Sequence, residues 1–296
     1  MFLTNIFCEV DDFCKGYQKY VTKNRLNQSS AEIGGRPPSM TLSDIITICV
    51  YFHYSGYHTF KRYYKDLICK ELKTAFRSLV SYNRFTELMQ EVVEPLGLFA
   101  TSRNSKNMRG IAFIDSTKLV VCHNLRIYSH KVFKGIAQRG KCSTGWFYGF
   151  KLHLVINHFG EILSFWITPG NTDDRNEKVV SKVTKNLFGW LFGDRGYISQ
   201  PLFDRLYKRG LKLVTSIKKD MKNKFVVFFE KLLLKKRNIV ESVNNILKNT
   251  FRIDHSRHRS VKNFFTNVFA GIAAYSFHQH KPAIGVGFFA EIKSVN

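Results

Sequence analysis

The amino-acid sequence predicts an α/β protein in which a mixed five-stranded sheet is flanked by helices and preceded by a small all-helical region. Two observations support this prediction. Up to about residue 100 the apolar residues recur at helical spacing, whereas after Gly110 they alternate as in strands and then fall into successive helical and extended segments. In addition, 44% of the 296 residues are hydrophobic, which is enough for a chain of this length to bury a substantial core.

The first hundred residues contain signals for several short helices. Thr41 and Asp44 form a capping box at the start of one helix, and a second helix is expected to begin at 81–85 and to end near Pro95. Two glycines and two prolines within 34–39 predict a linker. Lys, Arg and Tyr are frequent in these helices, which favours a DNA-binding module, although a helical packing domain without DNA contact would have the same pattern.

The strands are expected directly after the helical region. Residues 111–121 form a largely apolar run, and in 146–157 every second residue is apolar and shares one face. The sequence Asn-His-Phe-Gly that follows predicts a turn, after which residues 161–168 pair back as a hairpin. The first part of the sheet should therefore consist of three antiparallel strands.

After this hairpin, helical and extended segments alternate. The expected order is a helix at 174–187, a strand at 190–193, a helix at 199–209, a strand at 211–217 and a long helix at 225–249. Three antiparallel strands followed by alternating units imply a mixed sheet with helices on its faces, and this order is that of the RNase H-like fold. We therefore expect a helical region at 1–100, an RNase H-like domain at 108–280 and an irregular tail at 281–296.

Charge and composition indicate which kinds of partner, compartment and metal site the protein could have. Lys and Arg number 46 and Asp and Glu 22, so the formal net charge of +24 favours a polyanion, either nucleic acid or an anionic membrane surface. No apolar run reaches the ~20 residues that span a bilayer, and an N-terminus that turns acidic at Glu9 is unlike a signal peptide. Six widely spaced cysteines are typical of reduced thiols in the cytoplasm. No cluster of Cys or carboxylate side chains stands beside His255 and His258, which favours a basic loop facing DNA over a metal site.

Two aspartates stand where the predicted strands place a site. Asp115 lies inside an apolar strand, where a charge is costly unless it is paired or binds a cation; a strand that bends or ends there is the alternative. Asp194 follows a short strand, and sites in α/β sheets form at strand ends, although a simple Asp turn would look the same. Asp173 and Asp174 compete with them but fit the N-terminus of a helix better.

A third carboxylate shares a helix face with two cations. At ~100° per residue, Arg237 and Lys248 project near Glu241, and the apolar residues of this helix lie on the opposite side. A solvated charged face would explain the charges but not their coincidence with two strand-end aspartates. Two Mg²⁺ ions ~4 Å apart need several carboxylate oxygens, and nearby Arg and Lys hold phosphate. The pattern therefore predicts two-metal phosphoryl transfer.

Several longer segments support a family resemblance. These segments are SYNRF at 81–85, IDSTKL at 114–119, GWFYGFKLHLVIN at 145–157, TPGNTDDR at 168–175, GDRGYIS at 193–199, KRNIVESVNNILK at 236–248 and HSRHRS at 255–260. On these segments the chain resembles, from about residue 41 to 282, bacterial insertion-sequence transposases of the DDE class, most closely the insertion-sequence 982 family.

The resemblance implies a set of functional residues. Asp115, Asp194 and Glu241 would be the catalytic triad and the metal ligands. Arg237 and Lys248 match the Y-x2-R-x3-E-x6-K signature of the related insertion-sequence 4 group, but Leu234 stands in place of its Tyr and removes one possible phosphate contact. The residues expected to contact DNA are Arg195, Arg237, Lys248, Arg257 and Arg259.

The resemblance also implies a reaction and its partners. Such enzymes cut DNA at the ends of an insertion sequence and transfer the strands into target DNA, with two Mg²⁺ or Mn²⁺ ions as cofactor. They bind double-stranded DNA at terminal inverted repeats and at the target, usually as homo-oligomers. We expect residues 1–100 to bind the DNA ends, and we expect a cytoplasmic, nucleoid-associated protein with no membrane partner.

Two other functions remain open at this point. A catalytically inactive DNA-binding relic would keep the fold, and Leu234 and a tail unlike the usual ending of the family favour it. A different basic protein that binds RNA or a membrane surface is the third possibility, although neither an RNA-binding motif nor a basic amphipathic helix is evident.

Overall fold

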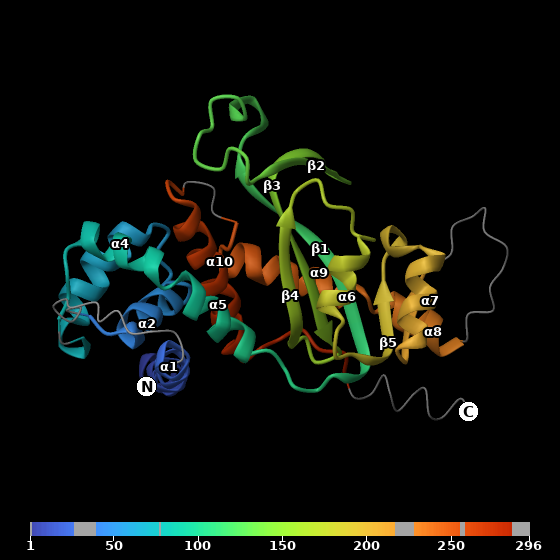
Figure 1. Ribbon diagram of the computed structural model, residues 1–296, viewed down its shortest axis with the longest axis horizontal. Coiled ribbons are helices and arrows are strands. Elements are labelled where there is room, and N and C mark those ends of the chain that lie inside the picture. Colours follow the sequence, from blue (N-terminus) through green and yellow to red (C-terminus); the bar gives the residue numbers. More distant parts are fainter. Residues whose placement is uncertain (1, 27–39, 77, 217–227, 255–257, 286–296) are drawn as a thin grey trace. The chain divides into compact units, whose positions relative to one another are not determined.

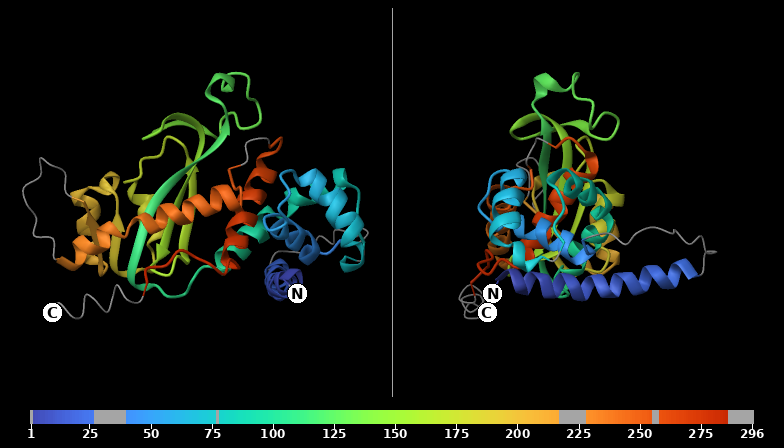
Figure 2. Two further views of the ribbon diagram at one scale, coloured as in Figure 1. Left: turned by 180° about the vertical axis from the view of Figure 1, so that it is seen from behind. Right: turned by 90° about the vertical axis from the view of Figure 1, so that its left-hand side faces the viewer.

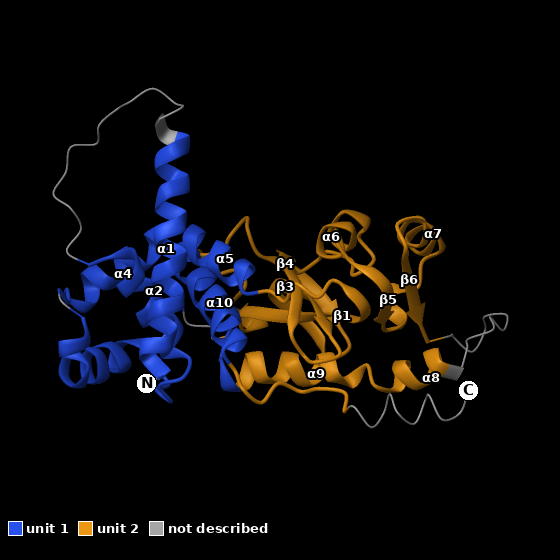
Figure 3. Ribbon diagram, turned by 90° about the horizontal axis from the view of Figure 1, so that it is seen from below, with its two compact units in different colours: residues 1–103, 250–253, 258–277 blue, residues 104–249, 254–257, 278–296 orange. Residues whose placement is uncertain are grey.

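The computed structural model describes residues 2–26, 40–76, 78–216, 228–254 and 258–285 (Figure 1; two further views are in Figure 2). The chain divides into two compact units, which are coloured separately in Figure 3. The first contains residues 1–103, 250–253 and 258–277, and the second contains residues 104–249, 254–257 and 278–296. The linker predicted at 34–39 lies outside the described residues.

The first unit is built from helices. They are α1 (Phe2–Leu26), α2 (Leu42–Phe52), α3 (Phe60–Arg62), the π-helical η1 (Tyr63–Glu71), the short η2 (Lys73–Ala75), α4 (Tyr82–Glu91), α5 (Val93–Ser102) and α10 (Val261–Ser276). The capping box predicted for α2 is confirmed, because the Asp44 amide donates to Thr41 Oγ1 at 3.0 Å and the Thr41 amide donates to Asp44 Oδ2 at 3.3 Å. Helix α5 continues beyond Pro95, which lies in its first turn, where a missing N–H is tolerated.

Helix α10 departs from the predicted division of the chain. Residues 258–277 were expected in the domain at 108–280, yet they belong to the helical unit. The reason is that α10 is apolar on most of its circumference and packs on α2, α4 and α5. Thr266 Oγ1 also donates to the Met89 carbonyl oxygen at 2.8 Å, and the ring of Phe269 lies against Gly97. The unit is therefore completed by a helix from far along the chain.

The second unit contains one mixed sheet. Its strands are β1 (Arg109–Cys122), β2 (Gln138–Cys142), β3 (Gly145–Asn157), β4 (Ile162–Pro169), β5 (Phe188–Gly193) and β6 (Leu211–Thr215). Strand β1 pairs antiparallel with β3 and parallel with β5, which in turn pairs parallel with β6. The far edge of β3 pairs antiparallel with β2 and then with β4.

This arrangement confirms the predicted fold class. The spatial order β4, β3, β1, β5, β6, with three antiparallel strands and two that are parallel to β1, is the RNase H-like order. Strand β2 is an addition that the sequence analysis did not predict. It pairs with the first residues of β3, which extend beyond the part of β3 that pairs with β4.

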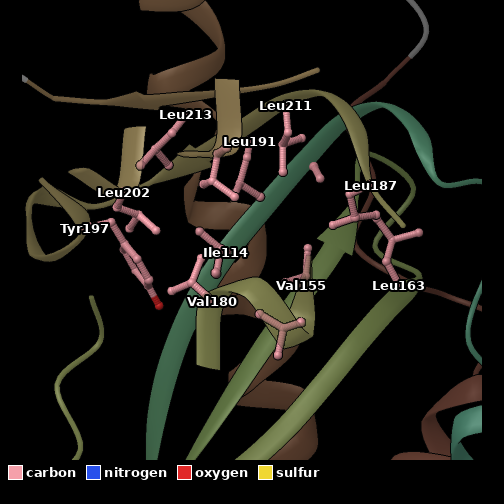
Figure 4. Close-up of a cluster of buried hydrophobic side chains, with 13 residues drawn as sticks. Ile114, Val155, Leu163, Val180, Leu187, Leu191, Tyr197, Leu202, Leu211 and Leu213 are labelled. Carbon is pink, nitrogen blue, oxygen red and sulfur yellow. The ribbon is translucent and has the colours of Figure 1, made fainter. Parts of the chain in front are cut away.

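Helices flank the sheet. They are α6 (Glu177–Val183), α7 (Gln200–Lys208), α8 (Phe228–Lys235), α9 (Asn238–Asn245), the π-helical η5 (Ile246–Thr250) and the short η3 (Asn124–Arg126) and η4 (Arg195–Tyr197). One face of the sheet and the helices α6 and α7 enclose a buried apolar cluster that includes Ile114, Val155, Val180, Leu191 and Leu202 (Figure 4). The other face carries α9, which packs on β1 and β3.

Two segments differ from their predicted form. The long helix expected at 225–249 is interrupted between Lys235 and Asn238, where the amides of Lys236 and Arg237 bond three residues back instead of four. At the start of the predicted tail, Ile284 is buried and its amide donates to the His158 carbonyl oxygen at 2.8 Å. Residues 286–296 lie outside the described residues. In the part of the chain that the structure describes, no helix combines the length and apolar character that a bilayer crossing requires.

Candidate active site

Asp115 occupies the centre of β1, opposite Leu154 of β3. Its neighbour Ile114 points into the apolar cluster on one side of the sheet, so Asp115 faces the side that α9 covers. Asn244 of α9 donates from Nδ2 to Asp115 Oδ2 at 2.9 Å. The carboxylate is therefore held between a central strand and a helix, with one side-chain donor directed at it.

Asp194 comes directly after β5, the parallel neighbour of β1. Its carboxylate accepts the Gly196 amide at 2.8 Å and so caps the short turn η4. The register of β1 and β5 places Phe113 opposite Phe192. A Cβ atom added at Gly193, the last residue of β5, would contact the side chains of Ile114 and Tyr197. Close packing of these strand ends brings Asp194 near Asp115.

Glu241 lies on α9 and is held by Arg237. Arg237 Nη2 donates to Glu241 Oε1 at 2.9 Å, four residues apart on the helix, while 53% of the Glu241 side chain remains exposed. The shared helix face expected from the sequence thus exists as a direct contact. Leu234 lies in a different helix from Glu241, because α8 ends at Lys235 and a new helix begins at Asn238.

The pKa of Asp115 depends on its burial and on the charged side chains around it. Burial is the main cause that raises it to about 7, and the charges of Asp194 and Glu241 raise it further, while the Ser116 amide and Arg237 act against the increase. Two carboxylates that act on a third must lie near it. All four residues lie in the second unit, and the charges of Asp194, Glu241 and Arg237 all act on Asp115.

The other predicted DNA contacts lie in different places. Lys248, in η5, has its pKa lowered chiefly by burial, and Asp115 is among the charges that act on it, so it belongs to the same group. Arg195 is exposed in the turn after Asp194. Arg259 is exposed in the first unit and is not among the residues that the second unit groups around Asp115. Arg257 lies outside the described residues.

Asp173 and Asp174 do not cap a helix as the sequence suggested. Asn176 caps α6 instead, since its side chain accepts the amides two and three residues further on. Asp173 binds Arg175, and the hydrogen bonds from this arginine lower the pKa of Asp173 to about 2. Asp174 accepts Ser116 Oγ at 2.7 Å and Lys151 Nζ at 3.0 Å, so its charge is matched by a buried lysine.

Sequence reasoning missed Asn244. It is three residues after Glu241 and therefore on the same side of α9, which is the signal that could have identified it. Its side chain is buried, Nδ2 donates to Asp115, and Oδ1 has no hydrogen-bond partner among the residues that the structure describes. A buried amide with one unsatisfied oxygen beside a carboxylate group is unusual, because such atoms nearly always have partners.

The donor set fits a hard divalent cation. Carboxylate oxygens from a strand, a strand end and a helix are the ligands that Mg²⁺ and Mn²⁺ take, and the unsatisfied Asn244 Oδ1 adds a neutral acceptor nearby. A cation would also favour the ionised form of Asp115, whose pKa is raised mainly by burial and further by repulsion from Asp194 and Glu241. Within the described residues, no three His, Cys, Asp or Glu side chains are already close enough to hold a metal ion. Metal binding would therefore require these carboxylates to move closer together.

We expect the pKa of Asp115 to make the stability of the metal-free protein depend on pH. Asp115 titrates near 7 when folded and near 3.8 when unfolded, so the folded state retains a proton that the unfolded state releases. The free energy of unfolding should therefore decrease as the pH rises from about 4 to about 7, by at most ~1.4 kcal/mol per pH unit. Urea unfolding in EDTA would measure this, and Asp115→Asn should flatten that part of the curve. An identical pH dependence in the variant would mean that Asp115 titrates normally.

Comparison with known proteins adds a family and several structural likenesses. Residues 105–261, more than half of the chain, match the family model described as "Transposase DDE domain". No curated protein sequence matches the chain. Among solved structures, a piggyBac transposase synaptic complex with hairpin DNA is 11% identical, with 99% of this chain and 82% of that chain covered and a TM-score of 0.41. A Mos1 transposase paired-end complex with the left transposon end is 11% identical, with 88% and 85% covered and a TM-score of 0.27.

Proposed function

This chain belongs to the transposase DDE domain family, and from that premise we propose that it cuts DNA at the ends of an insertion sequence and transfers the strands into target DNA. The observation that carries the proposal is the grouping of Asp115, Asp194 and Glu241 with two basic side chains in one unit. Three carboxylates suit divalent ions, and Arg and Lys beside them suit a DNA phosphate.

Each residue of the group has a distinct part in this proposal. Two divalent ions, Mg²⁺ or Mn²⁺, would supply the Lewis-acid chemistry of phosphoryl transfer when bound. Asp115, Asp194 and Glu241 would hold them, and Asn244 would fix the orientation of the Asp115 carboxylate through its hydrogen bond. Arg237 forms an ion pair with Glu241. It would contact a phosphate oxygen when the divalent ions hold Glu241 instead. Lys248 contributes a positive charge next to Asp115.

The partners and the setting are part of the proposal as well. We propose that the chain is a bacterial transposase of the insertion-sequence 982 family that acts at the nucleoid as a homo-oligomer. Its DNA partners would be the terminal inverted repeats of its own element and a target duplex. The helices formed by residues 1–100 would bind the DNA ends, and exposed Arg195 and Arg259 would add phosphate contacts. A net charge of +24 supports a polyanionic partner.

A cleavage assay tests the proposal. The purified chain is incubated with labelled duplexes that carry the DNA flanking its own gene, with Mg²⁺, with Mn²⁺ or with EDTA. We expect cuts at inverted repeats in both metals and none in EDTA, together with joining to a target plasmid. Specific binding of the repeats without any cut would instead identify the inactive DNA-binding relic. Binding that does not distinguish the repeats from other DNA would reject both functions.

Lys248 should contribute to DNA affinity. Replacing it with Ala removes one phosphate contact, so the plot of log affinity for duplex DNA against log salt should become shallower by about 0.9. Binding measured by fluorescence anisotropy at several salt concentrations gives this slope. Lys178→Ala, an exposed lysine on α6, is the matched control and should change the slope little. Equal slopes for the Lys248 variant and the wild type would show that this lysine does not contact DNA.

A further inference from the structure

The part of the second unit between Asp115 and Glu161 is unusually basic. Residues 116–160 contain seven Lys and Arg and no Asp or Glu. They include the end of β1, the connection at 123–137, the strand β2 and nearly all of β3. The connection at 123–137 projects beyond the sheet (Figures 1 and 2), and Tyr128 on it is 97% exposed. A surface of one charge sign with exposed aromatic rings is not explained by the packing of the sheet.

The centre of this surface is Trp146 with Arg139 and Lys141, which we call the Trp146 surface. Lys141 of β2 lies directly opposite Trp146 of β3, and Arg139 is two residues away on the same side of β2. The Arg139 guanidinium carbon is 5.0 Å and Lys141 Nζ is 5.7 Å from the centre of the indole ring. Both cations lie within the range of a cation–π contact, while Trp146 remains 52% exposed.

The Trp146 surface is fixed to the rest of the unit. Asn124 Nδ2 donates to the Trp146 carbonyl oxygen at 2.7 Å, which ties the β1–β2 connection to the start of β3. Asn124 lies in the short turn η3, two residues after β1. The indole ring is therefore presented on a strand that is anchored from both sides, and little conformational entropy would be lost when it binds a ligand.

The Trp146 surface also connects to the candidate active site. Thr144, in the turn between β2 and β3, accepts a hydrogen bond from Lys118 Nζ at 2.7 Å. The charges of Lys118, Cys142 and Asp115 all act on Lys248. Lys118 thus contacts the β2–β3 turn two residues before Trp146, and its charge also acts on Lys248 of the candidate active site.

This geometry points to a ligand that combines phosphates with a free aromatic face. In duplex DNA the base faces are covered by their neighbours, so an exposed indole ring gains nothing from them. In a single strand the bases can stack on aromatic side chains, and cations next to the ring hold the backbone. We propose that the Trp146 surface binds single-stranded DNA next to the active site, with an unpaired base on Trp146 and phosphates on Arg139 and Lys141. The position of this single-strand site next to the active site rests on the proposed function, because the bound DNA strand would lead away from the point of cleavage.

Tryptophan fluorescence can observe this binding directly. The chain has three tryptophans, so the variant Trp166→Phe with Trp190→Phe leaves only Trp146, and Trp146→Phe with Trp190→Phe leaves only Trp166. Trp166 is a matched control, because it is 40% exposed and Lys182 Nζ lies 3.1 Å from its ring centre. The full-length chain is titrated with a short oligothymidylate in EDTA. We expect quenching of Trp146 and no change at Trp166.

Affinity measurements complete the test. Trp146→Ala should weaken binding of the oligothymidylate by about 10- to 100-fold, as expected for one lost stacking contact, whereas Trp146→Phe should retain most of the affinity. Trp166→Ala should change the affinity for the oligothymidylate little, and Trp146→Ala should change the affinity for a blunt duplex little. The proposal is overturned if Trp146 shows no quenching, if Trp166→Ala causes an equal loss, or if Trp146→Ala weakens the duplex and the single strand alike.

The outcome is separable from that of the proposed function. Binding in EDTA requires no cleavage, so the quenching of Trp146 is measured independently of the transposase reaction. Quenching without any metal-dependent cut would reject the transposase reaction but keep the single-strand site. Cleavage at the inverted repeats with no role for Trp146 in binding would keep the reaction and reject this site.

Discussion

Replacing Glu241 with Gln should abolish metal-dependent DNA cleavage and leave the fold intact. The substitution keeps the shape of the side chain but removes the charge that a divalent ion needs. Even an outer partner of a metal site typically contributes about 10- to 100-fold to activity, so we expect a loss of at least ~100-fold. The main contact seen for Glu241 is a partly exposed ion pair with Arg237, and pairs of this kind contribute at most ~1 kcal/mol.

The matched control is Glu177→Gln. Glu177 lies at the start of α6 in the same unit, and its carboxylate forms a comparable ion pair with Arg205 at 2.6 Å. This variant should cleave like the wild type. Calorimetric titration with Mg²⁺ should also show weaker binding for the Glu241 variant only. Undiminished cleavage by Glu241→Gln would mean that the third metal ligand is a different residue.

The largest effect on stability is expected from Gly149→Ala. Gly149 lies in β3 where this strand pairs with β1, and a Cβ atom there would lie 2.0 Å from the Leu119 carbonyl oxygen. This oxygen is part of the backbone of a central strand, so it cannot move away without breaking the pairing of β1 and β3. We expect a loss of about 3 kcal/mol or more in the free energy of unfolding, at the upper end of overpacking effects, measured by urea denaturation.

Gly16→Ala is the contrasting substitution. Gly16 lies inside α1, and a Cβ atom there meets nothing within 4 Å. Because glycine is unfavourable within a helix, this change should stabilise the protein by ~0.5–1 kcal/mol. An unchanged unfolding midpoint for Gly149→Ala would contradict the register in which β1 and β3 pair.

The strands and their order along the chain could be predicted from the sequence, because the signals for each strand lie within one segment. Alternation in β3 and the apolar run in β1 lie within single segments, and the polar loops between them mark their ends. The contact between Arg237 and Glu241 was predictable for the same reason, since it spans one turn of a helix. Local periodicity also gave the start of α2 and its capping box.

Features that depend on distant segments were not predictable in this way. The hydrogen bond from Asn244 joins residues 129 positions apart, and the sequence does not state that the two elements meet. Strand β2 is short and forms only because β3 offers it a free edge. Helix α10 was placed in the wrong compact unit, because its apolar surface indicates that it is buried but does not indicate which partner covers it.

The place of α10 in the chain has a consequence for biosynthesis. A ribosome adds ~5–20 residues each second, so α10 leaves it roughly 10–30 s after α5, once the whole sheet has been made. During that interval the apolar surface that α10 later covers on α2, α4 and α5 has no native cover. A nascent chain would therefore depend on chaperones during this interval. A chain that stopped before residue 261 would keep that surface exposed and become a substrate for proteolysis.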